Sequence, residues 1–150
     1  MTTPHVVIYT DGACKGNPGR GSWAAVLLSG SHGEQAVKEI SGVAELTTNN
    51  QMELTAVIEA LKCLKKKCKV TLHSDSAYIV NAFHQNWIRH WQRNGWRTKE
   101  KKPVKNQDLW ESLLEQCGRH EVRFEKVKGH AGVHWNERVD TLANLALDKE

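Results

Sequence analysis

The chain lacks several features that would place it in a special class of protein. None of its 150 residues belongs to an apolar run approaching the roughly 20 residues that a membrane-spanning helix needs. The first five residues have no basic start and no apolar core, so we expect no secretion signal and a cytoplasmic location. Internal repeats, low-complexity tracts and linkers are also missing. With 39% hydrophobic and 25% charged residues, the composition is typical of one globular domain over residues 1–150.

Cysteine is present, but not in a metal-binding pattern. The four cysteines are Cys14, Cys63, Cys68 and Cys117, and none belongs to a C-x-x-C pair, which argues against a zinc site. In a reducing compartment they are expected to be free thiols. Cys63 and Cys117 fall on apolar helix faces and are interpreted as small core residues. Cys14 closely follows Asp11, where it could face a ligand.

Acidic residues are scarce between Trp87 and Lys105. This segment holds seven Lys or Arg residues and one Glu, a net charge of +6 in a chain whose total is +4. The rest of the chain therefore has a net charge of −2. A basic segment on a mildly acidic body predicts a polyanionic partner that is bound locally.

The hydrophobic pattern predicts three strands, followed by a helix, a strand, several helices, a strand and a final helix. The expected strands are residues 6–11, 23–28, about 34–43, 70–74 and 121–128, and the expected helices are about 48–61, 76–83, 87–95, 108–117 and a last one through Val139 and Ala146. Thr48 and Gln51 fit a capping box at the first helix. A meander followed by crossover units predicts an α/β (mixed α+β) fold, with a mixed sheet and helices packed on its faces.

Four acidic residues lie at ends or rims of these elements. Asp11 and Asp75 each end a predicted strand, at the edge where α/β sheets bind ligands. Glu53 and Asp140 lie at the rims of their helices' apolar faces, Glu53 roughly 75° from the centre of its stripe at 100° per residue. Any one of these acids alone is explained as a surface group or a helix cap. Together they can converge on hard cations such as Mg²⁺, which is the chemistry of phosphodiester hydrolysis.

Five phrases carry a resemblance to a known family. They are YTDGACKGNPG at 9–19, TTNNQMEL at 47–54, HSDS at 73–76, VKGHAG at 127–132 and NERVD at 136–140. In this order and spacing they closely resemble bacterial-type ribonuclease H of type 1, over about residues 6–147. The resemblance implies a five-stranded mixed sheet flanked by helices on both faces. It also implies endonucleolytic cleavage of the RNA strand of RNA–DNA hybrids, leaving 5′-phosphate and 3′-hydroxyl ends.

The resemblance also implies roles for individual residues. The metal ligands would be Asp11, Glu53, Asp75 and Asp140, which would hold two Mg²⁺ ions when substrate is bound, with Mn²⁺ as a substitute. His130, in a glycine-flanked loop, would assist proton transfer or product release. The other interpretation of His130 is a plain surface-loop histidine. Glu137 would modulate the second metal.

Substrate contacts are expected around these acids and on the basic protrusion, which we define as residues 87–105. Telling RNA from DNA requires contact with 2′-hydroxyls in the wide minor groove of an A-like helix. The residues placed for this are Gly12, Cys14, Asn17, Thr48, Asn49 and Asn50, and Thr48, at a helix N-terminus, suits a phosphate of the DNA strand. On the protrusion they are Trp87, Trp91, Trp96, Lys101, Lys102 and Lys105. Helix capping also explains the asparagines, and packing against a neighbouring helix also explains the tryptophans.

Two other functions remain open from the sequence. One is a different nuclease on a similar carboxylate-bearing fold, such as a Holliday-junction resolvase or a 3′–5′ exonuclease. The other is a hybrid-binding module without catalysis, against which four converging acids argue. Ala77 stands where relatives often carry glutamine, so one substrate hydrogen bond is expected to be missing. We expect a monomer that acts without a membrane or an obligate protein partner.

Overall fold

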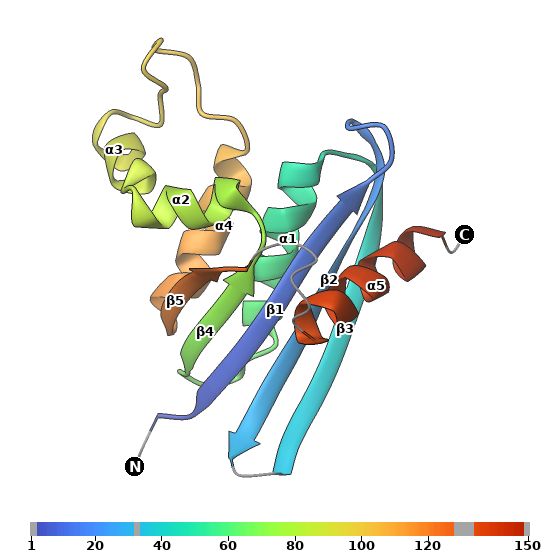
Figure 1. Cartoon of the computed structure of the whole chain (residues 1–150). Coiled ribbons are helices and arrows are strands. Elements are labelled where there is room, and N and C mark those ends of the chain that lie inside the picture. Colours follow the sequence, from blue (N-terminus) through green and yellow to red (C-terminus); the bar gives the residue numbers. More distant parts are fainter. Residues whose placement is uncertain (1–2, 32–33, 128–133, 149–150) are drawn as a thin grey trace.

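The computed structural model describes residues 3–31, 34–127 and 134–148 (Figure 1). The elements are β1 (His5–Cys14), β2 (Gly19–Ser31), β3 (Glu34–Thr47), α1 (Asn49–Lys62), β4 (Lys69–Ser74), α2 (Ala77–His84), α3 (Trp87–Arg93), α4 (Gln107–Gly118), β5 (Glu121–Lys126) and α5 (His134–Asp148). The predicted order of strands and helices is confirmed. No helix in the described ranges is long and apolar enough to cross a membrane.

The five strands form one mixed sheet in the order β3-β2-β1-β4-β5. The first three strands pair antiparallel, whereas β4 runs parallel to both β1 and β5. This division follows from the connections, because short turns join antiparallel strands and parallel strands require a crossover. Thr10 of β1 pairs with Ser74 of β4, so the residues that follow them, Asp11 and Asp75, lie side by side.

Helices cover both faces of the sheet (Figure 1). On one face, α1 and α4 enclose the larger core, whose fully buried side chains include Ile8, Leu54, Leu61, Leu72 and Trp110. On the other face, α5 packs over β1, β2 and β3 on a smaller core made of Ala24, Val26, Leu28, Val139 and Ala143. The metal-binding candidates lie where these two layers meet the end of β4 and the point at which β1 stops pairing with it.

The structure corrects several predicted boundaries. β2 and β3 are longer than the predicted strands 23–28 and about 34–43. β1 does not end at Asp11 but continues to Cys14, because Gly12, Ala13 and Cys14 pair with residues 21–23 of β2. The small residues after Asp11 indicated a loop from local sequence, and the hairpin partner overrides that preference. Between α2 and α3 the chain breaks at Asn86, whose φ of 59° is left-handed. Phe83 therefore lies on α2, whereas Trp87 and Trp91 lie on α3.

Candidate metal centre

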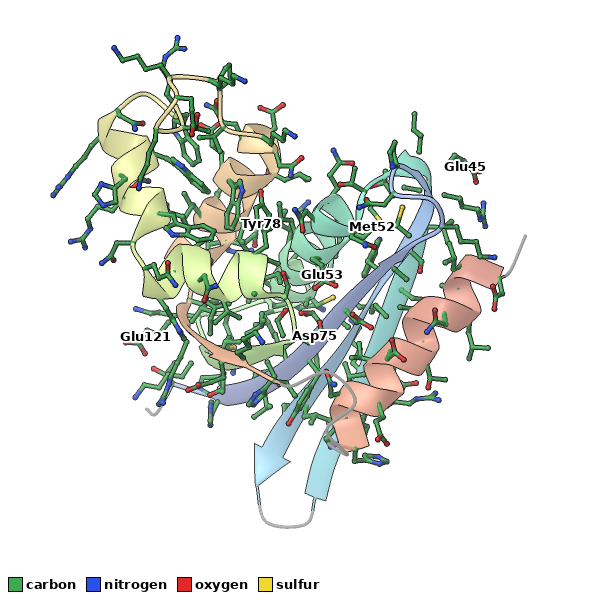
Figure 2. All side chains as sticks on the ribbon, turned by 45° about the horizontal axis from the view of Figure 1, so that its top comes forward. Glu45, Met52, Glu53, Asp75, Tyr78 and Glu121 are labelled. Atoms are coloured by element: carbon green, nitrogen blue, oxygen red, sulfur yellow. The ribbon has the colours of Figure 1, made fainter. Side chains whose placement is uncertain are left out.

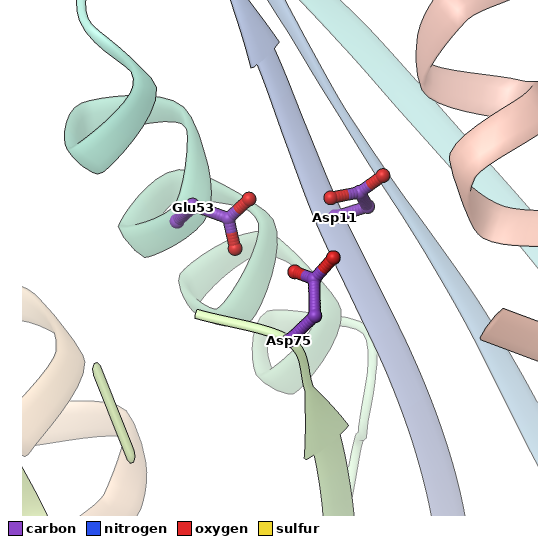
Figure 3. Close-up of side chains that lie close together, drawn as sticks. All are labelled: Asp11, Glu53 and Asp75. Atoms are coloured by element: carbon purple, nitrogen blue, oxygen red, sulfur yellow. The ribbon is translucent and has the colours of Figure 1, made fainter. Parts of the chain in front are cut away.

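Three of the four predicted carboxylates come together in the structure. Asp11 of β1, Glu53 of α1 and Asp75, which directly follows β4, each offer an oxygen within 4.8 Å of the others (Figure 3). Their side chains converge from three elements that are far apart in the sequence. In the whole molecule, Glu53 and Asp75 lie between helix α2 and the strands β1 to β3 (Figure 2). An interior position of β1, the end of β4 and the second turn of α1 thus form one acidic centre.

Gly12 allows α1 to approach β1 closely enough to bring Glu53 into this centre. A Cβ atom at Gly12 would lie 2.7 Å from the Glu53 nitrogen, so any larger residue would push the helix away. The Gly12 N–H donates to Asp11 Oδ1 at 2.9 Å and to Glu53 Oε1 at 2.8 Å. One backbone donor therefore orients two of the three carboxylates.

The start of α1 is fixed as the sequence predicts, with one difference. The Thr48 hydroxyl accepts a hydrogen bond from the Gln51 N–H at 3.2 Å, so Thr48 is the N-cap. The Gln51 side chain does not complete a reciprocal box. It accepts from the Thr47 hydroxyl at 2.9 Å and donates to Asn106 at 3.2 Å. The start of α1, and so the direction in which Glu53 points, depends on two contacts. The sequence predicted the Thr48 cap, but it did not predict the bond between Gln51 and Asn106.

Burial makes it unfavourable for the acids of this centre to be ionised without a positive charge nearby. Asp11 and Glu53 are each only 7% exposed, so Glu53, predicted at the rim of its helix's apolar face, is buried. Burial first, and then Asp75 and Asp140, raise the pKa of Asp11 to about 8. Burial, Asp11 and Asp75 also raise the pKa of Glu53 well above its usual value, against the lowering effect of the Gly12 hydrogen bond. Charge repulsion in a site that excludes water favours a bound cation.

The donor set fits a hard divalent ion. All three converging groups present carboxylate oxygens, the ligands that Mg²⁺ and Mn²⁺ prefer. Glu53 Oε2 is buried and has no hydrogen-bond partner in the described part of the chain. A buried oxygen without a partner costs free energy unless something binds it. A metal ion would satisfy this atom and offset the repulsion between the acids.

Asp140 reaches the centre from the opposite layer. It is half-buried on α5, and its proximity helps to raise the pKa of Asp11. It is not one of the three acids whose oxygens lie within 4.8 Å of one another. Glu137 is exposed in the first turn of the same helix. His130 lies outside the described residues, and its role stays a prediction.

Four of the six substrate residues predicted near the acids line one polar groove, and Gly12 and Cys14 do not. The groove runs along the start of α1, and its lining residues are Asn17, Thr48, Asn49, Asn50, Gln51, Lys105 and Asn106. Asn17 Oδ1 accepts from the Asn49 N–H at 2.9 Å and so ties the β1–β2 turn to the helix. Cys14 was expected to face a ligand, but its thiol donates to the Thr47 carbonyl at 3.4 Å. Its contact with substrate stays a prediction.

A hydrogen-bonded chain that the sequence analysis missed supports the rim of this groove. Asn106 Oδ1 accepts from Gln51, and its Nδ2 donates to the Tyr78 hydroxyl at 3.4 Å. The same hydroxyl accepts from the fully buried Trp110 indole at 2.9 Å. Asn106 adopts a left-handed backbone with φ of 63° and makes no capping bond to α4. Its side chain instead joins α1, α2 and α4, and no local pattern signals this.

The basic protrusion extends from the body as α3 and the loop that follows it (Figure 1). Its three predicted phosphate-binding lysines, Lys101, Lys102 and Lys105, are exposed. The tryptophans are half-buried and pack on one another. The ring centroid of Trp91 lies 5.9 Å from that of Trp96 and 5.5 Å from that of Trp110. The indoles therefore anchor the protrusion to the core, as the packing interpretation expects, and their substrate contacts stay a prediction.

Buried converging carboxylates at parallel strand ends, beside a polar groove and a basic protrusion, define a metal-dependent nuclease. The RNase H family model matches residues 3–148, and the chain belongs to the RNase H family. It is 61% identical over 142 residues to a ribonuclease H of Symbiobacterium thermophilum, covering 95% of this chain and 94% of that protein. It is also 54% identical over 145 residues to a ribonuclease H of Chlorobium luteolum, covering 97% of each chain.

Solved structures agree with this assignment. LC9-RNase H1, a type 1 RNase H with the type 2 active-site motif, superposes with a TM-score of 0.88 at 30% identity, over 98% of this chain and 74% of that one. LC11-RNase H1, solved in complex with an RNA/DNA hybrid, gives a TM-score of 0.72 at 25% identity, over 95% and 96% of the two chains. The five-stranded mixed sheet and its helices are thus those of the RNase H fold.

Proposed function

We propose that this protein is an endoribonuclease that hydrolyses the RNA strand of RNA–DNA hybrids with the help of two divalent metal ions. Mg²⁺ is the proposed cofactor and Mn²⁺ its substitute. The observation that carries the proposal is the buried centre of Asp11, Glu53 and Asp75, in which Glu53 Oε2 has no hydrogen-bond partner among the described residues. Membership of the RNase H family supports the choice of substrate.

The chain's own residues would act by holding and orienting. Asp11, Glu53, Asp75 and Asp140 would bind the metal ions, and the Gly12 N–H keeps two of these carboxylates in place. Divalent ions in such a site supply a nucleophilic water near neutral pH and stabilise the charge that develops on the phosphate. His130 would carry a proton at the departing oxygen. The proposed products have 5′-phosphate and 3′-hydroxyl ends.

Substrate would lie across the groove and reach the basic protrusion. At the N-terminus of α1 the N–H groups of Asn49 and Gln51 already donate to Asn17 and Thr48, and the positive end of the helix dipole would attract a phosphate of the DNA strand. Gly12 lies beside the carboxylates and Asn17 and Asn49 line the groove, and contact of these residues with a 2′-hydroxyl would identify the RNA strand. The exposed lysines of the protrusion would hold backbone phosphates without reading sequence.

We further propose that the protein works as a cytoplasmic monomer without an obligate protein partner. The three converging carboxylates come from a single chain. The four cysteines are free, which suits a reducing compartment. Sedimentation of the purified protein alone and with hybrid would test the monomer, and a stable dimer that alone is active would contradict it.

The test of function is cleavage of labelled hybrid, duplex DNA, RNA duplex and a four-way DNA junction, with and without Mg²⁺. We expect cleavage of the RNA strand of the hybrid alone, and only with metal. Asp11→Asn should lose at least roughly 10³-fold in turnover, as when one key electrostatic group is removed. Asp108→Asn, an exposed acid in the first turn of α4, is the matched control and should stay active. Junction cleavage would favour a resolvase, and tight hybrid binding without cleavage would favour a binding module.

A further inference from the structure

Helix α5 is tied to the far edge strand of the sheet by one charged pair close to Asp140. The Arg138 guanidinium binds the Glu39 carboxylate of β3 with two hydrogen bonds, from Nε to Oε2 at 2.7 Å and from Nη2 to Oε1 at 3.0 Å. Such a two-point contact fixes orientation as well as distance. The hydrogen bonds from Arg138 lower the pKa of Glu39, so the pair stays ionised across the neutral range.

The three consecutive residues 138–140 point in different directions around the helix. Each residue advances by about 100°, and Val139, in the middle, is fully buried against the sheet. Arg138 on one flank holds β3, while Asp140 on the other flank lies close enough to Asp11 of β1 to raise its pKa. With Val139 as the pivot, a rotation of α5 that releases Arg138 also moves the Asp140 carboxylate. The Glu39–Arg138 pair therefore affects the position of Asp140 more directly than it affects the packing of the core.

Other polar attachments hold α5 further along. The Ser22 hydroxyl donates to the Ala143 carbonyl, and Lys15 pairs with Asp148 at 3.2 Å. Asp148 lies about 12 Å along the helix from Asp140, at 1.5 Å per residue. This ion pair lies at the far end of α5 from Asp140, and both of its side chains are exposed. The two pairs can therefore be compared as variants of the same helix.

We propose that the Glu39–Arg138 pair positions the Asp140 carboxylate for metal binding by fixing the rotation of α5. This rests on the role proposed above for Asp140. The side chains are 41% (Arg138) and 31% (Glu39) exposed, and ion pairs this exposed contribute little to global stability. Removing the pair should therefore leave the protein folded and impair the site alone. Glu39 and Arg138 are positioning residues, since neither belongs to the group of converging acids.

The experiment compares Glu39→Gln, Arg138→Gln and the charge-swapped double variant Glu39→Arg/Arg138→Glu with wild type. Each single variant should lose about tenfold in kcat, less than the roughly 100-fold of a 1 Å misplacement. The Mg²⁺ concentration for half-maximal activity should rise, while KM for hybrid changes little. Calorimetric titration of the substrate-free protein with Mn²⁺ should show weaker binding, and thermal unfolding should stay close to wild type. The swapped pair should recover part of both losses.

Two further variants separate this proposal from the one it rests on. Asp148→Asn breaks an ion pair on the same helix and should leave kcat and metal binding unchanged. Asp140→Asn should weaken metal binding strongly. If it does not, the metal role of Asp140 fails, and the positioning proposal fails with it. The positioning proposal alone is overturned if Asp140→Asn weakens metal binding but neither Glu39→Gln nor Arg138→Gln does. It is also overturned if Glu39→Gln and Arg138→Gln change KM or stability instead of metal binding.

Discussion

Replacing Asp11 with asparagine should make the metal-free protein more stable at alkaline pH. Burial, Asp75 and Asp140 raise the pKa of Asp11 from 3.8 to about 8. Between these two values the folded protein binds a proton that the unfolded chain has released. The free energy of unfolding therefore falls as the pH rises from about 4 to about 8, and stays low above that. Asparagine has no charge to bury, so the variant avoids this loss.

The size of the gain can be bounded from the structure. Each unit of difference in pKa corresponds to about 1.36 kcal/mol, so the interval between 3.8 and about 8 gives an upper limit of roughly 6 kcal/mol. Local relaxation and entering water reduce the effective penalty for a buried charge, and we expect about 2 kcal/mol. For a protein of this size, that raises Tm by about 4–8 °C.

The assay is thermal unfolding in a chelator at about pH 5 and about pH 9, followed by circular dichroism. Asp11→Asn should gain over wild type at the higher pH and much less at the lower one. Excess Mg²⁺ should narrow or reverse the difference, because the wild type binds the ion better in its folded state. The exposed control Asp108→Asn should show no gain. Suppose that Asp11→Asn has a normal circular dichroism spectrum but no higher Tm than wild type in the chelator at about pH 9. That result would refute the conclusion that negative charge in this centre destabilises the fold.

Three further results are expected. Neutralising Lys101, Lys102 and Lys105 should raise KM and lower the salt dependence of binding, by up to about 0.9 in log–log slope for each lost phosphate contact, with kcat nearly unchanged; a fall in kcat alone would contradict this. His130→Ala should reduce turnover by roughly 10²-fold with calorimetric metal affinity unchanged, and an affinity loss like that of an acid variant would place it among the ligands. Gly12→Ala should reduce metal affinity and turnover together, because the added Cβ would meet α1 at 2.7 Å; unchanged calorimetry would show that close approach is not required.

Local sequence predicted the parts of the site that depend on local structure. The strand that ends at Ser74, the Thr48 cap and the order of the elements all follow from short patterns and are confirmed. The neighbouring placement of Asp11 and Asp75 also followed, because parallel strands bring their carboxyl ends to one edge. Predicting these features requires only the neighbouring residues in the sequence and the rules of sheet topology.

What the sequence did not predict depends on contacts between distant segments. The burial of Glu53 results from the approach of α1 to Gly12, which a helical wheel does not contain. The extension of β1 to Cys14 results from its pairing with β2. The Gln51–Asn106 bond joins residues 55 positions apart and supports the groove without any motif. Each is a tertiary effect that overrides or adds to a local preference.

The two layers of the fold divide the metal centre between parts of unequal stability. Glu53 lies on α1, which covers the larger core, whereas Asp140 lies on α5, which covers a smaller one. Local opening is least costly where little apolar surface is buried. In native-state hydrogen exchange, the α5 amides should therefore exchange through openings that leave α1 protected. Such openings would remove Asp140 from the centre and leave the other three acids in place. Helix α5 would then dock and undock as a cooperative unit, and a bound metal ion would favour the docked state.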